Sequence, residues 1–405
     1  MAKPFVAYYR TLENNCRTID VNNIYETVET TTHEKNFFEL MKGYDGNDDG
    51  LRRFKDDLVQ WSAELMSNRT LKINYLKYFN HMNACEMTFK RLCKGKYEEF
   101  ETIDSLESSW IENCHNGGLT YCEKGTHQSH GHDFSSFYPN IMGEYKFKMP
   151  VKCGTERILK VLPTNLELGF YRVKISSDHK HATKVFAFSP NHTYTSTSLE
   201  YAINLSEDRG VHFNIELIVD GSPNAYIYTE FVRGHAVFDN WLRKLYDIKQ
   251  VFPKNKLIKH LLSSLHGSLS RSNSVYKTAE DIESEGLDVS MGNSSEYKII
   301  DYRSYSTEYL HYKLQSNRNP YRYNFRLKSF LSSYGRTKIA EVALQKIDKV
   351  IYIHTDGIAF CEDIRLNFPF LVRDKGTTGL IKYNHVNSHT GLGLDITKVA
   401  SSHPP

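Results

Sequence analysis

The chain has 405 residues, of which 40% are hydrophobic and 24% charged, so it can bury a core and form two or three subdomains, and a disordered chain is excluded. It contains no apolar run of about 18 residues and no apolar stretch near its start, which excludes a predicted membrane span and a signal peptide. The net charge of +3 gives weak support for a polyanionic partner, and the seven cysteines lack the CxxC spacing of a zinc site.

The first hundred residues are predicted to be mainly helical. Apolar residues recur at three-to-four spacing in three segments, 37–44, 51–66 and 73–92. From residue 117 the pattern changes to short strands, first at 117–125 and then at 133–139, where the chain is expected to enter a central sheet.

The rest of the chain mixes strands and helices. Strands are predicted at 170–176, 183–189, 213–220 and 225–231. Helices are predicted at 198–204, at 237–269 with an interruption near Pro253, and at 327–345. A polar stretch covers about 270–325, and the segment KVIYIHTDGIAF at 349–360 predicts a tight β-hairpin, because two apolar runs flank a polar turn.

Three stretches combine Lys and Arg with aromatic residues, namely 89–97, 243–259 and 318–328. Such a composition suits phosphate contacts and stacking on bases. A solvated basic face explains any single stretch about equally well.

Two aspartates are candidates for metal-assisted phosphoryl transfer. Transfer from a nucleoside triphosphate needs alignment and charge neutralisation, which two divalent ions about 3.5–4 Å apart can supply. Such hard ions prefer carboxylate oxygens held on rigid elements. Asp133 of HDFSSFYP and Asp356 of YIHTDGI form a candidate pair if their strands lie side by side.

The segments around these aspartates resemble the motifs of family B DNA polymerases of the protein-primed branch. DFSSFYP at 133–139 resembles motif A, D-x-x-S-L-Y-P. KHLLSSLHG at 259–267 resembles motif B, K-x-x-x-N-S-x-Y-G, and YIHTDG at 352–357 resembles motif C, Y-x-D-T-D-S. CHNGG at 114–118 resembles the Y-x-G-G element before motif A, and SSYGRTKIAEVAL at 332–344 resembles the helix before motif C. The motifs occur in the order of the family.

The resemblance implies an α+β fold: a polymerase palm with an antiparallel sheet and helices, helical fingers, and a mainly helical N-terminal remnant of an exonuclease domain. The expected parts are a helical remnant at 1–110, palm at 111–150, an insertion resembling terminal-protein region 1 at 151–235, fingers at 236–270, an insertion resembling terminal-protein region 2 at 271–326, palm at 327–390 and a truncated tail at 391–405.

The resemblance also implies roles for single residues. Asp133 and Asp356 would be catalytic and would bind two Mg²⁺ or Mn²⁺ ions together with the backbone carbonyl of Phe134. Tyr138 would exclude a ribose 2′-hydroxyl as a steric gate. The other implied nucleotide-binding residues are Ser136, Phe137, Lys249, Lys259, Ser263 and Gly267. His115, Gly117 and Gly118 would contact the template, and His354 and Thr355 would neighbour Asp356 in motif C.

Several positions depart from the family pattern. His354 replaces the first motif C aspartate, so weaker metal affinity and an altered pH profile are expected. Ser263 and His266 replace Asn and Tyr in motif B, which favours altered fidelity over loss of activity. No D-x-E motif occurs in residues 1–60, Met82 stands where the last exonuclease aspartate is expected, and little thumb follows motif C, so we expect no proofreading and weak grip on the duplex.

These features predict a DNA-directed DNA polymerase. Its expected partners are template and primer DNA, deoxynucleotides, and a terminal priming protein or a second polymerase fragment, with no membrane. It would work in the cytoplasm or at a nuclear or viral replication site. A catalytically degenerate polymerase fold that binds nucleic acid or a replication partner is the alternative. A metal-dependent nuclease explains neither DFSSFYP nor the helix of Lys259.

Overall fold

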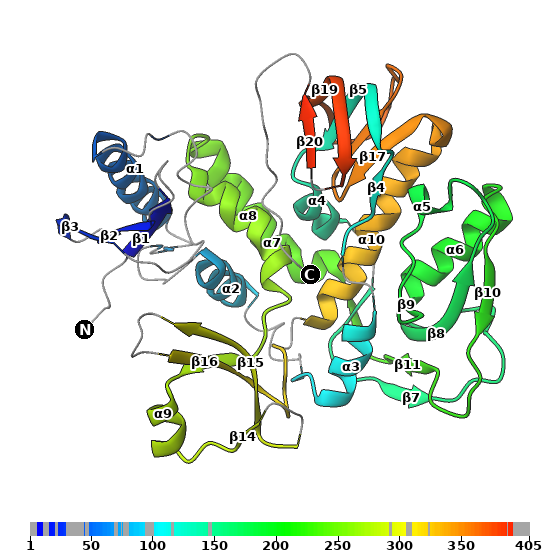
Figure 1. The fold of residues 1–405 in the computed structure, drawn as a ribbon, viewed down its shortest axis with the longest axis horizontal. Helices are drawn as coiled ribbons and strands as arrows, with labels where there is room; N and C mark the ends of the chain where they lie inside the picture. Colours follow the sequence, from blue (N-terminus) through cyan, green and yellow to red (C-terminus); the bar gives the residue numbers. More distant parts are fainter. Residues whose placement is uncertain are drawn as a thin grey trace. The chain divides into compact units, whose positions relative to one another are not determined.

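The computed structural model divides the chain into two compact units, each of which is described by itself (Figure 1). Unit 1 joins Met1–Phe100 with His235–Arg322, and unit 2 joins Glu101–Gly234 with Tyr323–Pro405. The structure describes residues 6–10, 16–20, 23–29, 44, 48–68, 72–73, 75, 81–93, 101–114, 117–144, 148–290, 294–304, 310–322, 325–386 and 388–391.

Unit 2 contains a six-stranded antiparallel sheet in the order β20-β19-β5-β18-β17-β4. Its strands are β4 (Thr120–Cys122), β5 (Gly125–Phe134), β17 (Val350–His354), β18 (Gly357–Phe360), β19 (Leu371–His385) and β20 (Ser388–Gly391). Ile351, Tyr352, Ala359, Ile381 and Tyr383 form a buried cluster on this sheet. Three strands that follow one another in the sequence, β17, β18 and β19, therefore share this core.

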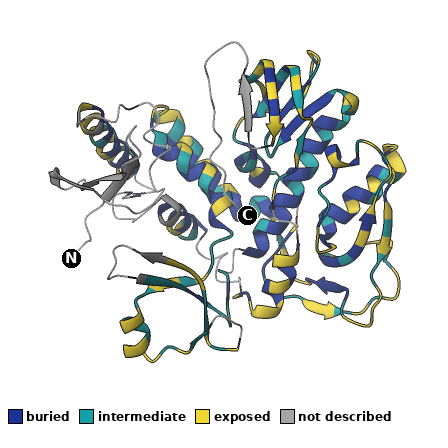
Figure 2. Cartoon of the chain, viewed as in Figure 1, coloured by how far each residue is buried: buried dark blue, intermediate teal, exposed yellow. Residues whose placement is uncertain are grey.

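Helix α10 (Phe325–Leu344) is largely buried in unit 2 (Figure 2). A helix that packs on several sides needs apolar or small residues around its whole circumference. α10 meets this need with residues such as Leu327, Ser329, Gly335 and Ala340, all of them buried. It contacts α3 (Ser105–Asn113), α4 (Phe137–Gly143), α5 (Ala182–Val185) and α6 (Ser196–Asp208).

Unit 2 also holds two smaller antiparallel sheets. One has the order β10-β8-β11-β7 with β9 paired to β8, and the other pairs β12 with β6. Their strands are β6 (Lys148–Pro150), β7 (Thr155–Arg157), β8 (Gly169–Ser176), β9 (Thr193–Thr195), β10 (Asn214–Leu217), β11 (Ala225–Ile227) and β12 (Phe231–Arg233).

Unit 1 combines helices with two small sheets. Its helices are α1 (Asp48–Ser67), α2 (His81–Leu92), α7 (Gly234–Val251), α8 (Lys256–Ser268) and α9 (Ala279–Ser284). One sheet has the order β1-β2-β3 and the other β13-β16-β15-β14. Their strands are β1 (Val6–Arg10), β2 (Cys16–Asp20), β3 (Asn23–Glu29), β13 (Ser274–Lys277), β14 (Val289–Ser290), β15 (Tyr297–Ser304) and β16 (Leu310–Ser316).

The start of α8 is fixed by a local cap. The Asn255 side chain accepts hydrogen bonds from the backbone amides of Leu257 and Ile258, 3.0 and 3.4 Å long, which satisfies two donors that the helix leaves unpaired. Its amide nitrogen donates to the Trp61 carbonyl of α1 at 2.9 Å. The cap therefore ties α8 to α1 and explains the interruption predicted near Pro253.

The structure confirms the mixed α+β fold with antiparallel sheets. It also confirms helices at 51–66, 198–204, 237–269 and 327–345, and the hairpin at 349–360. Residues 37–43 of the helix predicted at 37–44 lie outside the described residues, as does the side chain of Met82 on α2. Within the described ranges, none of the helices has the length and apolar character that crossing a bilayer requires.

One helix prediction and two strand predictions were wrong. The described residues between 6 and 29, expected to belong to a mainly helical region, form the strands β1, β2 and β3. Residues 183–185 belong to the short helix α5, where the buried Lys184 donates hydrogen bonds from Nζ to the carbonyls of Val350 and Ile347 at 2.7 and 3.3 Å. Asp133 does not open a strand but lies near the end of β5, and α4 begins at Phe137. Ser136 reverses the chain there with a left-handed φ of 54°, and Pro139 suits the first turn of the helix.

Candidate active site

Asp133 and Asp356 lie on neighbouring elements of the main sheet of unit 2. β5 and β18 pair antiparallel, with Asp133 opposite Gly357. The amide of Phe134 donates a hydrogen bond to the carbonyl of Asp356 at 2.9 Å, immediately beyond that pair. The main chain thus brings Asp133 and Asp356 close together, because Asp133 pairs with the residue that follows Asp356. In the sequence, 223 positions, 356 − 133, separate the two aspartates.

The turn that carries Asp356 is tight. Thr355 adopts a left-handed φ of 60°, and its amide donates to the carbonyl of Leu119 at 3.0 Å. A Cβ placed on Gly118 would lie 2.6 Å from Thr355 Oγ1, so only glycine allows this close approach. The predicted template element therefore packs directly against the predicted motif C turn. Gly117 is exposed, and His115 lies outside the described residues.

The surroundings of the Asp356 carboxyl change its pKa. Burial raises its pKa, while the neighbouring His354 opposes that rise. The His354 ring stacks on that of Tyr352, with 6.4 Å between centroids and 14° between planes. A buried carboxylate without full solvation favours a nearby cation, so the site suits a positively charged ligand beside Asp356.

The donor set fits Mg²⁺ or Mn²⁺ in part. Across the described residues, no group of three or more His, Cys, Asp or Glu side chains is placed to hold a metal. Mg²⁺ does not need such a cage, because it keeps several waters and is commonly bound by one or two carboxylates and the phosphates of a substrate. Asp133, Asp356 and the carbonyl of Phe134, the donors predicted from the sequence, are of the chemical kind that this mode uses, and a Cβ on Gly357 would be in ordinary van der Waals contact with Asp133 Oδ1 at 3.7 Å.

Tyr138, the predicted steric gate, lies on α4 against α10. Its ring meets Phe137 edge-on at 5.2 Å, and a Cβ on Gly335 would come within 3.2 Å of it. Burial raises the pKa of Tyr138, and the charge of Asp356 raises it further, whereas Arg336 and a hydrogen bond with Ser332 lower it. The tyrosine is therefore fixed by α10 within electrostatic reach of Asp356.

The two residues before Tyr138 differ in environment. Phe137 is buried and packs on Phe134, with 5.1 Å between ring centroids, so its side chain belongs to the core. Ser136 is half-buried at the left-handed turn before α4. Successive backbone amides in such a turn can form a concave site that binds an anion. The predicted contacts of the Ser136 and Phe137 amides with the triphosphate require such a site.

Arg336 of α10 was not predicted from the sequence to belong to the site. Its buried guanidinium donates hydrogen bonds to the carbonyl of Gly117 at 2.7 Å, to Ser333 Oγ at 2.9 Å and to Ser198 Oγ at 3.2 Å. Burial lowers the pKa of Arg336. The available signal was a lone arginine among small and apolar residues in the segment 332–344. Through this residue, α10 holds the segment of Gly117, the predicted template element, and α6.

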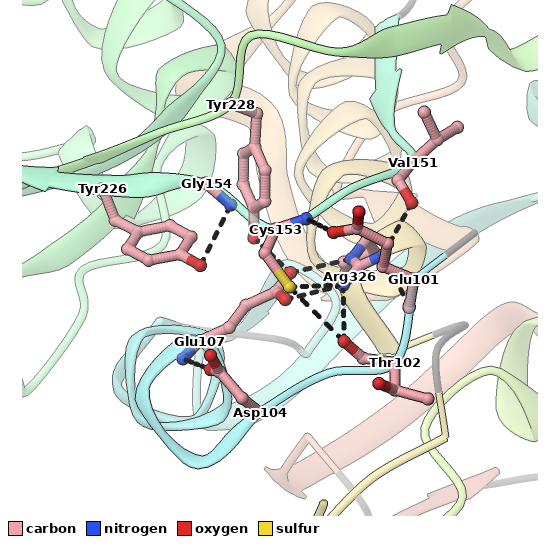
Figure 3. Close-up of polar contacts among 10 residues, drawn as sticks. All are labelled: Glu101, Thr102, Asp104, Glu107, Val151, Cys153, Gly154, Tyr226, Tyr228 and Arg326. Carbon is pink, nitrogen blue, oxygen red and sulfur yellow. Dashed lines mark hydrogen bonds and ion pairs between the residues drawn. The ribbon is translucent and has the colours of Figure 1, made fainter. Parts of the chain in front are cut away.

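A buried ion pair anchors the other end of α10 (Figure 3). Arg326 and Glu107 are both fully buried, and their two parallel hydrogen bonds measure 2.7 and 2.6 Å. Arg326 also donates to the carbonyl of Val151 at 2.8 Å, while the Tyr228 hydroxyl donates to Glu107 at 2.8 Å. Neither residue of the pair was singled out in the sequence, because their partnership depends on tertiary structure. The pair joins α10 to α3.

The remaining predicted nucleotide-binding residues lie in unit 1. Lys259, Ser263 and Gly267 occur four residues apart on the exposed face of α8. Ser263 Oγ donates to the carbonyl of Lys259 at 3.0 Å. Lys249 on α7 is half-buried, with its Nζ 5.8 Å from the ring centroid of Tyr246. Their proximity to the aspartates of unit 2 stays a prediction.

Comparison with known proteins found similarity in structure only. No protein-family model and no curated protein sequence matches the chain. The fold resembles phi29 DNA polymerase in complex with primer-template DNA and incoming nucleotides, with a TM-score of 0.58 and 13% identity over 84% of this chain and 59% of that one. It also resembles the post-translocation binary complex with primer-template DNA, with a TM-score of 0.56 and 14% identity over 84% and 58% of the two chains. The chain thus spans less than two thirds of the proteins that it matches.

Proposed function

We propose that this chain is a DNA-directed DNA polymerase of family B that extends a primer by two-metal phosphoryl transfer. The observation that carries the proposal is the pairing of β5 with β18, which places Asp133 beside the turn of Asp356. Support comes from the motif order and from the likeness in fold to phi29 DNA polymerase. The protein-primed branch, the absence of proofreading and the division into palm and fingers belong to the same proposal.

The residues of the site have distinct tasks in this proposal. Asp133, Asp356 and the Phe134 carbonyl would hold divalent ions, which neutralise the triphosphate and lower the pKa of the primer hydroxyl when bound. The amides of Ser136 and Phe137 would bind phosphate oxygens. The ring of Tyr138, fixed against Gly335, would leave no space for a 2′-hydroxyl. Lys259 would add a positive charge for the triphosphate.

A second candidate function is nucleic-acid binding without catalysis. It is favoured by one observation: His354 replaces a carboxylate, and its ring stacks on Tyr352. Such a site would hold fewer negative charges for metal ions. A polymerase fold could then bind a strand, or a replication partner, and leave catalysis to another protein.

Primer extension on a template with a 5′ overhang separates the two functions. With Mg²⁺ or Mn²⁺, we expect template-directed incorporation that falls by about 10³-fold in Asp133→Asn and Asp356→Asn, because several kcal/mol of charge stabilisation are lost. Asp348→Asn is the matched control, because Asp348 has a 59% exposed side chain and pairs only with its neighbour Lys349 among the ion pairs of the described residues. Retained DNA binding without any incorporation by the wild type would establish the second candidate.

A further inference from the structure

Phe370 is an exposed aromatic residue in a strained turn before β19. The turn runs from Phe368 to Leu371, and the amide of Leu371 donates to the carbonyl of Phe368 at 3.3 Å. Pro369 suits the second position of such a turn, whereas a third position with positive φ is ordinarily Gly or Asn. Phe370 occupies that third position with a left-handed φ of 65°, which a bulky side chain disfavours. Its ring gains little burial in return, because Phe370 is 60% exposed.

The turn is attached to the candidate active site at three points. The carbonyl of Phe370 accepts a hydrogen bond from the amide of Ser135 at 2.8 Å. The Phe368 ring meets the ring of Phe134 edge-on, with 5.8 Å between centroids and 87° between planes. Leu371 then pairs with Phe134 where β19 begins. These contacts hold the main chain on both sides of Phe370, so the fold imposes the left-handed conformation.

Unfavourable backbone conformations gather at this end of the main sheet of unit 2. In the part of the chain that the structure describes, five non-glycine residues have a positive φ, and three of them are Ser136, Thr355 and Phe370. Ser136 follows β5, Thr355 lies between β17 and β18, and Phe370 precedes β19. Because β5 pairs antiparallel with β18 and with β19, all three lie at the same end of the sheet. Strained residues cluster at active sites and at segments that hold ligands.

A second exposed apolar residue lies directly beside Asp133. Val372 pairs with Asp133 across β5 and β19 and is 51% exposed. Residues directly opposite each other in antiparallel strands share one face of the sheet, with Cβ atoms about 4.5–5.5 Å apart. On the other side of Asp133, its partner is Gly357, the residue after Asp356. Asp133 therefore has the turn of Asp356 on one side and the apolar side chain of Val372 on the other.

We propose that Phe370 and Val372 form an apolar platform that packs against the terminal nucleotide of the primer. The proposal rests on the proposed function, in which the primer hydroxyl reacts beside Asp133. Exposed apolar side chains offer phosphates no donor, whereas the faces of bases are apolar enough to stack on an aromatic ring. A nucleoside therefore suits this surface better than a phosphate does.

The primer, and not the incoming nucleotide, is the occupant that the layout favours. The triphosphate is assigned to the amides of Ser136 and Phe137 at the start of α4. In-line displacement brings the attacking hydroxyl from the side away from the leaving pyrophosphate, so the primer needs a surface on another element. β19 supplies such a surface next to Asp133, because Val372 and Phe370 lie at its start.

Phe370→Gly separates the role of the ring from that of the backbone. The substitution removes the ring and relieves the left-handed strain, so we expect the midpoint of thermal unfolding to stay unchanged or to rise. We expect the KM for primer-template to rise about tenfold, the order of magnitude for the loss of one stacked base, while the KM for the deoxynucleotide stays unchanged. Phe370→Tyr keeps the ring and should keep the wild-type KM. Should Phe370→Gly not fold, Phe370→Asn carries the test, because asparagine also tolerates this conformation.

Val372→Ala tests the second part of the platform and should raise the KM for primer-template several-fold. Val219→Ala is the matched control, because Val219 is a 60% exposed valine of the same unit that follows β10 of another sheet. It is expected to leave both KM values unchanged.

A photochemical cross-link reports the contact without any turnover. An iodouracil base at the end of the primer, irradiated in the complex with EDTA, forms a bond with an aromatic side chain that it touches. We expect the cross-linked peptide of the wild type to contain Phe370, and the cross-link to be lost in Phe370→Gly.

Two results would overturn the inference while the proposed function stands. One is a wild-type KM for primer-template in folded Phe370→Gly and Val372→Ala, and the other is an effect confined to the KM for the deoxynucleotide. Failure of the proposed function has a different signature: the wild type would extend no primer, although the terminal iodouracil still cross-links to Phe370.

Discussion

The backbone amide of Phe134 donates a 2.9 Å hydrogen bond to the carbonyl oxygen of Asp356. This bond and the Asp133 and Gly357 pair fix the two aspartates through the main chain. Replacement of either carboxylate by an amide leaves these backbone contacts in place. The two substitutions therefore report on chemistry at the carboxylates and change the fold little.

Tyr138→Ala is expected to relax the exclusion of ribonucleotides. The tyrosine ring is held between Phe137 and α10, and its removal opens space beneath the sugar. We expect the preference for deoxynucleotides over ribonucleotides, measured as a ratio of kcat/KM values, to fall by about 10- to 10²-fold. Tyr138→Phe keeps the ring and should retain most of the preference. Equal discrimination by Tyr138→Ala and the wild type would exclude Tyr138 as the gate.

Arg336→Lys is expected to loosen the segment of Gly117, the predicted template element. Lysine cannot reach the carbonyl of Gly117 and both serine hydroxyls with one fork of donors, so at least one buried acceptor loses its partner. We expect unfolding to become easier by about 1–3 kcal/mol, measured with urea, and the KM for primer-template to rise. Ser198→Ala removes one acceptor but keeps the Gly117 contact, and should raise KM less. Equal KM values for the two variants would show that the Gly117 contact has no role in template binding.

Glu107→Gln is expected to cost about 3–5 kcal/mol of unfolding free energy, because Arg326 then keeps a buried charge without its carboxylate. Urea denaturation measures the change. Glu230→Gln is the control: Glu230 pairs with Lys152 at 2.9 Å on the surface, where side chains 54% and 39% exposed predict a loss below about 1 kcal/mol. Similar losses in both variants would contradict an anchoring role for the Arg326–Glu107 pair.

His132 is expected to make the fold sensitive to mild acid. It is 6% exposed, and its Nδ1 has no hydrogen-bond partner among the described residues. Burial, followed by the charge of Arg373, lowers its pKa below the ordinary value of about 6.5. The unfolded chain therefore binds a proton before the folded chain does, and stability falls as pH drops from about 6.5 toward the folded pKa.

The melting temperature between about pH 7.5 and 5 measures this effect, a range that brackets the ordinary histidine pKa. His132→Gln should show a shallower decline than the wild type, because the titrating group is gone. Parallel curves for the two proteins would assign the acid sensitivity to other residues.

Local signals in the sequence predicted part of this structure. The 349–360 hairpin and the amphipathic helix α8 depend on short-range patterns, and both were predicted. The helix at Phe137 was missed because it depends on the left-handed turn at Ser136, which a serine adopts only when the fold imposes it. The Arg326–Glu107 pair could not be predicted, because 219 residues separate its members and a buried pair has no local signature. The placement of Asp133 beside Asp356 required both the hairpin and the pairing of β18 with β5.

The rate of single-nucleotide incorporation in a double-mutant cycle tests the pairing of the two aspartates most directly. Asp133→Asn, Asp356→Asn and the double variant are compared with the wild type at saturating Mn²⁺ and deoxynucleotide. If both carboxylates hold the same ions, each single variant loses about 10³-fold and the double variant loses little more, because the two residues act as one unit. Losses that multiply in the double variant, or a single variant that retains the wild-type rate, would contradict joint metal binding by Asp133 and Asp356.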